Sequence, residues 1–166
     1  MIPLLLALSV TVQLTDSARQ VRYERVLSDV SNALDAVRGA AAGFRTDLSR
    51  ASSELVLERA ARIRNSCRSA DAAAGQQQAL LAEGVYTPVA QPEQARLMAE
   101  TTRLRQTLAR CQREWGVPDR PRVSDADSLR AWGPYRTAQL DGALRRFIAS
   151  LRSFMKKAEL KKPAVS

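Results

Sequence analysis

The chain has 166 residues, enough for one domain with a buried core, and its formal net charge is +9. Aromatic residues make up only 5% of the sequence, and Ala, Leu and Arg dominate a composition that favours helices. Histidine is absent, which removes the commonest general base, metal ligand and axial haem ligand, and two cysteines cannot complete a structural zinc site. We therefore expect a non-enzymatic protein with no catalytic residue, no metal and no cofactor.

An apolar run opens the chain. Residues 2–14 carry no charge over 13 positions, whereas a helix that spans a membrane needs about 20 apolar residues. The run is similar to the hydrophobic part of a secretory signal, although no basic residue precedes it. We interpret residues 1–15 as a signal-like or anchoring segment that docks on a membrane or a partner. The docking residues that we expect are Ile2, Leu4, Leu5, Leu6, Leu8, Val10 and Val12.

Two apolar stripes follow in alternating steps of four and three residues, the period of long packed helices. The first stripe contains Tyr23, Leu27, Val30, Leu34, Val37, Ala41, Phe44, Leu48, Ala51 and Leu55. The second is offset by one residue and contains Val56, Ala60, Ile63, Cys67, Ala70, Ala74, Gln77 and Leu81. Because the offset falls beside the serines of residues 49–53, we predict a tight turn with a serine cap. One continuous helix with a shift in phase is the alternative.

Gly84 is expected to end the second helix, and Pro88 and Pro92 bracket a loop. A third helix is predicted to open at Pro92 and Glu93. Its apolar stripe contains Leu97, Thr101, Leu104, Leu108, Cys111 and Trp115, and Gly116 and Pro118 end it.

The two cysteines of the chain, Cys67 and Cys111, lie on the stripes of the second and third helices. Their midpoint falls within the proline-containing loop, so at about 1.5 Å per residue both lie roughly 32 Å from the tip of an antiparallel hairpin. Equal heights on facing stripes predict a disulfide, and closing a loop of this length stabilises a fold by about 4 kcal/mol. Two free, buried thiols are the alternative.

A polar connector, residues 117–123, leads to the fourth helix. Ser124 followed by Asp127 is typical of a helix N-terminal cap, and Gly133–Pro134 is expected to break or kink the helix. The stripe then continues through Leu140, Leu144, Phe147, Leu151, Phe154 and Ala158. We expect Trp115, Trp132 and Tyr135, which flank the connector, to close the end of the core. Four helices with short connections predict an all-α, antiparallel four-helix bundle over residues 16–160.

Positive charge gathers at the C-terminal end, where residues 128–166 carry nine basic and two acidic side chains and all the lysines of the chain. The preceding residues are close to neutral. The basic set suggests a surface for lipid headgroups or an acidic protein, and a solvated basic face is the alternative. Its members are Arg145, Arg146, Arg152, Lys156, Lys157, Lys161 and Lys162, and residues 161–166 form a basic tail.

No nucleotide-binding, metalloprotease or hydrolase motif is present, and the acids of residues 119–127 lack the spacing of a calcium loop. We therefore expect a structural or accessory subunit of a bacterial membrane-associated complex, for example a respiratory or photosynthetic one. Its partners would be other protein subunits and the membrane surface, with no small-molecule substrate. A periplasmic four-helix sensor is the first alternative, and a nucleic-acid-binding protein is the second.

The compartment is indicated by two opposing features. A disulfide favours an oxidising location, whereas Arg19, Arg22 and Arg25 after the apolar run favour the cytoplasmic face. We predict a periplasmic, membrane-associated protein, with the cytoplasmic face as the alternative.

Overall fold

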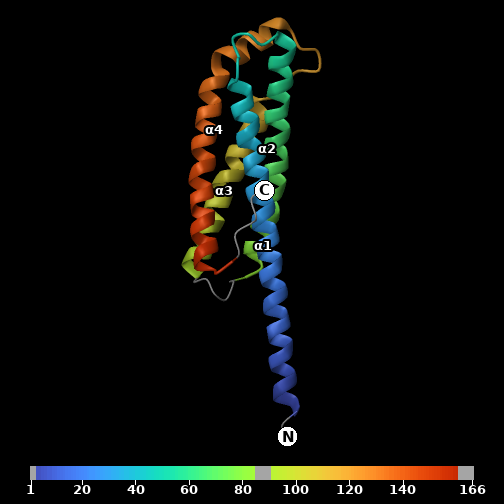
Figure 1. Ribbon diagram of the computed structural model, residues 1–166, viewed down its shortest axis with the longest axis vertical. Helices are drawn as coiled ribbons and strands as arrows, with labels where there is room; N and C mark the ends of the chain where they lie inside the picture. Colours follow the sequence, from blue (N-terminus) through green and yellow to red (C-terminus); the bar gives the residue numbers. More distant parts are fainter. Residues whose placement is uncertain (1–2, 85–90, 161–166) are drawn as a thin grey trace.

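The computed structural model describes residues 3–84 and 91–160, with side chains from residue 17 onward. Its elements are α1 (Pro3–Arg45), α2 (Ser53–Ala82), α3 (Gln91–Glu114) and α4 (Val123–Lys157), and the described residues form no strand (Figure 1). The expected all-α fold, an antiparallel four-helix bundle, is confirmed.

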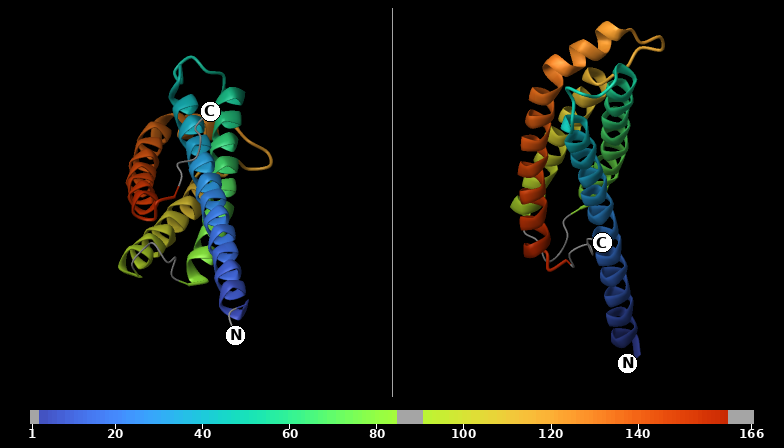
Figure 2. Two further views of the ribbon diagram at one scale, coloured as in Figure 1. Left: turned by 60° about the horizontal axis from the view of Figure 1, so that its bottom comes forward. Right: turned by 45° about the horizontal axis from the view of Figure 1, so that its top comes forward.

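Helix α2 packs against each of the other three helices, whereas the backbones of α1 and α3 do not approach each other closely within the described residues. Helix α4 packs on α1, α2 and α3. The turn between α1 and α2 and the connector between α3 and α4 lie at one end of the bundle, and the end of α4 lies at the other (Figures 1 and 2).

The predicted apolar stripes form the core. On α1, the stripe from Tyr23 to Phe44 is at most 2% exposed, and every member of the α2 stripe is at most 3% exposed. The last three residues of the first stripe were assigned wrongly, because α1 ends at Arg45. Leu48 and Ala51 lie in the turn, Leu55 lies in the first turn of α2, and all three are only partly buried.

The predicted tight turn between α1 and α2 is confirmed. Asp47 adopts a positive φ of 47°, and its carbonyl accepts hydrogen bonds from the backbone N–H groups of Arg50 and Ala51. The hydroxyl of Ser52 then accepts a hydrogen bond from the N–H of Leu55, which caps α2 as a serine at this position commonly does. The reversal therefore needs no glycine or proline.

Helix α4 begins earlier than the sequence suggested. Arg122, not Ser124, is the N-cap residue, and the carboxylate of Asp125 accepts a hydrogen bond of 2.7 Å from the Arg122 N–H. Pro134 lies inside the helix and does not end it. The first turns of α4 lean across the end of the bundle at an angle to the rest of the helix, as expected where a proline removes a backbone donor (Figure 2).

The predicted disulfide is confirmed: Cys67 and Cys111 are bonded, with their Cα atoms 6.3 Å apart. Both residues are buried between α2 and α3, at 0% and 3% exposure. The bond closes a loop over a sequence separation of 44 residues. It therefore links the two central helices of the chain covalently.

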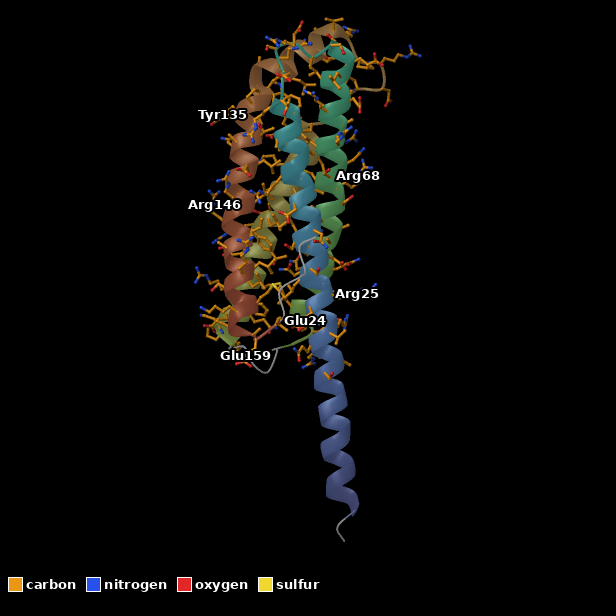
Figure 3. The ribbon with its side chains drawn as sticks, in the orientation of Figure 1. Glu24, Arg25, Arg68, Tyr135, Arg146 and Glu159 are labelled. Atoms are coloured by element: carbon orange, nitrogen blue, oxygen red, sulfur yellow. A yellow bond between two sulfur atoms is a disulfide. The ribbon has the colours of Figure 1, made fainter. Side chains whose placement is uncertain are left out.

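Aromatic rings fill the end of the core near the connector. Trp115 is buried and packs edge-on against Phe44, with ring centroids 4.8 Å apart, and against Trp132 at 4.9 Å. The prediction that Tyr135 joins them is wrong, because its side chain is 65% exposed and its hydroxyl accepts a hydrogen bond from Gln139 (Figure 3). Its place on the outer face of α4 follows from the register of the helix.

Candidate docking surfaces

The first turns of α1 project well beyond the other helices (Figure 1). From residue 17 onward, where side chains are described, Tyr23 is the first residue of α1 that is buried in the bundle. From Pro3 to Tyr23 the helix rises about 30 Å, at about 1.5 Å per residue. The predicted docking residues from Leu4 to Val12 belong to this projecting segment by backbone position, while Ile2 lies outside the described residues. None of the helices in the described ranges is both long and apolar enough to cross a membrane.

Where α1 enters the bundle, the guanidinium of Arg22 donates two hydrogen bonds of 2.7 Å to the carboxylate of Glu83, just after α2. Both side chains are about half exposed. Exposed pairs of this kind contribute little to stability, and the side of α1 that faces the bundle is set by its buried apolar stripe.

Some of the predicted basic residues of α4 form ion pairs within the protein, and others do not. Arg145 forms an ion pair with Asp141, and Lys157 reaches across to Glu93 on α3 at 2.7 Å. Arg146, Arg152 and Lys156 are exposed and form no ion pair with any residue that the structure describes. Lys161 and Lys162 lie outside the described residues.

These contacts lower the pKa values of two carboxyl groups. Hydrogen bonds from Arg145, and then from Arg38 at 3.2 Å, lower the pKa of Asp141 below its ordinary value. The hydrogen bond from Lys157 lowers the pKa of Glu93 in the same way. Both acids therefore stay ionised at neutral pH and neutralise part of the charge of α4.

A continuous groove runs between α3 and α4. Three hollows of about 350, 440 and 460 Å³ lie along it, and neighbouring hollows share lining residues. The first and second share Arg96 and Ser150, and the second and third share Thr107 and Arg146. We call this feature the basic groove.

The basic groove combines an apolar floor with charged walls. Buried Leu104 and Phe147 form part of the floor, and small residues of α4 such as Ala143 leave it open. Its lining contains six basic and three acidic side chains: Arg96, Arg103, Arg110, Arg136, Arg146 and Lys157, with Glu93, Glu100 and Glu114. The groove therefore carries an excess of positive charge.

The contribution of α3 to this surface was not predicted from the sequence. Arg96, Arg103 and Arg110 are spaced by seven residues, which places them on one face of a helix. That signal was present in the sequence, but it points to a groove only when the position of α4 is known. Of the predicted basic residues on α4, only Arg146 and Lys157 line the groove.

Another hollow, of about 550 Å³, is lined by residues of α1 and α2. Small residues line it on α1, and Arg59 and Arg62 border it on α2. Among the residues with described side chains, no cluster of three or more potential metal ligands occurs.

No family model, no curated protein and no solved structure matches this chain. The function is therefore inferred from the surfaces of the bundle and not from relatives.

Proposed function

We propose that the protein is a non-enzymatic accessory subunit of a membrane-associated multiprotein complex, such as a respiratory or photosynthetic assembly. In this role the projecting part of α1 attaches the bundle to the membrane surface or to a membrane-bound subunit. One observation carries the proposal: the apolar projection of α1 and the basic end of α4 lie at the same end of the bundle (Figure 1).

The common end follows from the antiparallel order of the helices. Because α4 runs opposite to α1, its last turn, with Lys156 and Lys157, lies at the end from which α1 projects. Lys156 is exposed there. Basic side chains near an anionic lipid surface each contribute about 1 kcal/mol of attraction. An apolar segment and a basic rim at one end are the usual combination in proteins that bind at the membrane surface.

The length of the apolar run supports attachment at the interface over crossing. The part of the run that lies in α1, residues 3–14, rises about 18 Å, against a hydrocarbon thickness of about 30 Å. The buried disulfide supports an oxidising compartment, and we therefore propose the periplasmic side.

Sedimentation of the full chain with lipid vesicles tests this proposal. We expect binding to vesicles that contain anionic lipid and weaker binding to neutral vesicles. The double substitution Leu5→Glu and Leu8→Glu places two charges on one face of the projecting helix and should abolish sedimentation. The matched control, Asn32→Glu and Ala42→Glu, adds the same charges at exposed positions of α1 within the bundle and should lose far less binding.

Two outcomes would contradict the proposal. The first is a full chain that stays in the supernatant with both vesicle types and co-purifies with no membrane complex. The second is equal loss of binding in the Leu5/Leu8 and Asn32/Ala42 variants, since added negative charge alone would then explain the effect.

A further inference from the structure

We infer that the basic groove between α3 and α4 is a docking site for an acidic amphipathic helix of a partner protein. This inference goes beyond the proposed attachment through α1, because it concerns a different surface and requires no membrane. It stands on the shape of the groove, its apolar floor and the arrangement of its charges.

The shape of the groove fits a helix. The lining on α3 extends from Glu93 to Trp115, which corresponds to about 33 Å at the helical rise per residue. Three connected hollows along that length would take the groove-facing side chains of a partner helix of about 20 residues. Ala143 and Ser150 on α4 would allow its backbone to approach closely. A helix laid lengthwise in an apolar groove is a common mode of peptide recognition.

The charged side chains of the groove indicate that the partner helix is acidic. Three of the basic side chains in the groove are already paired with acids of α3: Arg103 with Glu100, Arg136 with Glu114 and Lys157 with Glu93. The other three, Arg96, Arg110 and Arg146, form no ion pair within the described part of the chain. These three arginines are therefore available for ion pairs with carboxylates of a partner protein.

The spacing of the arginines predicts the pattern of the partner. Arg96, Arg103 and Arg110 repeat every seven residues, and the pair with Glu100 leaves the Arg103 side chain 72% exposed. A helix that lies along α3 would therefore meet all three arginines with acids at the same interval. Its apolar side chains would then face Leu104 and Phe147 on the floor. We therefore expect Glu or Asp at seven-residue intervals beside an apolar stripe.

The same lining argues against a nucleic acid or a lipid layer as the occupant. Nucleic acid presents a dense row of phosphates, whereas Glu93, Glu100 and Glu114 leave the lining of the groove with an excess of only three basic side chains. A lipid layer is flat, whereas this groove is concave and runs along the side of the bundle. A helix can place its charges beside the arginines alone.

Fluorescence anisotropy with a labelled 21-residue helical peptide tests the inference. The peptide carries Glu at three positions seven residues apart beside a stripe of Leu and Ala, and a second peptide has Gln at those positions. The oxidised full chain should bind the Glu peptide and should bind the Gln peptide at least about tenfold more weakly, which corresponds to about 1.4 kcal/mol.

Two sets of variants locate the binding site. The groove set is Arg96→Glu, Arg110→Glu and Arg146→Glu, and it should weaken binding of the Glu peptide by at least about tenfold. A milder set with Gln at these positions should weaken it in the same direction, which guards against loss of folding. The control set, Arg25→Glu, Arg50→Glu and Arg68→Glu, changes exposed arginines outside the groove by the same total charge and should stay within about twofold of the parent protein. Figure 3 shows Arg25 and Arg68 on the side of the bundle opposite Arg146.

Three results would overturn the inference: no binding of the Glu peptide, equal weakening by the groove and control sets, or equal binding of the Glu and Gln peptides. Anionic vesicles and duplex DNA serve as competing ligands. If the groove set lost binding to either of these and kept binding to the peptide, the groove would serve another class of partner. The variant Leu5→Glu, Leu8→Glu should bind the peptide normally, so failure at the groove and failure at α1 can be told apart.

Discussion

Replacing Gly133 by alanine should destabilise the bundle, although the same change usually stabilises a helix. Gly133 is buried within α4 beside the aromatic end of the core. A Cβ atom at this position would lie 2.4 Å from Cε1 and 2.7 Å from Cζ of Phe44, and 3.4 Å from Cη2 of Trp115. The first two distances are far shorter than any ordinary carbon–carbon contact, so Phe44 or the helix must move.

Two opposing contributions determine the expected change in the free energy of unfolding. Alanine is favoured over glycine in a helix by about 1 kcal/mol, whereas adding a methyl group to a filled core costs about 1–3 kcal/mol. We take the upper end of that range because Phe44 is fully buried and its ring packs against Trp115. The net loss is then about 2 kcal/mol, or a decrease of about 4–8 °C in the melting temperature for a chain of this size.

The control is Gly142→Ala in the same helix. There the nearest atom to an added Cβ is Nη1 of the flexible Arg146 side chain, at 3.8 Å, so only the helix term applies. We expect a gain of about 0.5–1 kcal/mol. Urea unfolding followed by circular dichroism at 222 nm, with the disulfide intact, measures both variants. The double variant Gly133→Ala, Phe44→Leu should lose less stability than the sum of the single changes.

Stabilisation of the protein by Gly133→Ala, to the same extent as by Gly142→Ala, would refute the reasoning. It would mean that Phe44 has free space into which to move. The tight approach of α4 to the aromatic end of the core would then not be required for stability.

Three further predictions concern the interior and the ion pairs. The double substitution Cys67→Ala, Cys111→Ala should lower the free energy of unfolding by up to about 4 kcal/mol. Reduction of the disulfide in the parent protein should lower the urea midpoint of unfolding to a similar degree. An unchanged midpoint would contradict a stabilising role of the disulfide. Gln77→Met should raise stability by about 1 kcal/mol in the same assay, because the buried Oε1 of Gln77 has no hydrogen-bond partner among the described residues. A loss would show that the hydrogen bond from Nε2 of Gln77 to the hydroxyl of Thr101, at 2.8 Å, contributes more. Since the pKa of Asp141 is lowered in the folded protein, its contribution is present above the ordinary value near 3.8 and disappears as the pH falls through the lower folded value. The stability difference between the parent and Asp141→Asn, measured by urea unfolding, should therefore shrink from pH 7 to pH 2.5, and a constant difference would contradict this linkage.

The fold was predictable because its main determinants are periodic. Stripes in steps of four and three residues define buried helix faces whatever the exact helix ends are. The position of the cysteines added one long-range contact, since equal distances from a hairpin tip place Cys67 and Cys111 at one height. Both kinds of information depend on sequence spacing alone, and the structure confirms both.

Helix ends and surfaces were harder to predict. The sequence at the start of α4 offers two possible helix caps, one that begins at Arg122 and one that begins at Ser124. The structure has the first, in which the carboxylate of Asp125 accepts a hydrogen bond from the N–H of Arg122. It was equally difficult to predict which charged side chains form ion pairs within the protein. Arg145 and Lys157 turn to acids of the protein itself, whereas Arg96 and Arg110 remain open in the basic groove. Such pairings depend on the rotation of α3 relative to α4, which periodicity does not specify.

The bond between Cys67 and Cys111 also limits how far the chain can be stretched. Tension applied between the tip of α1 and the end of α4 would pass through the sulfur atoms and bypass the segment between them. That segment spans a sequence separation of 44 residues, which corresponds to about 150 Å of extended chain at about 3.3–3.6 Å per residue. A subunit held at both ends could therefore lose its outer helices under load, yet its two attachment points could never separate by the full length of the polypeptide.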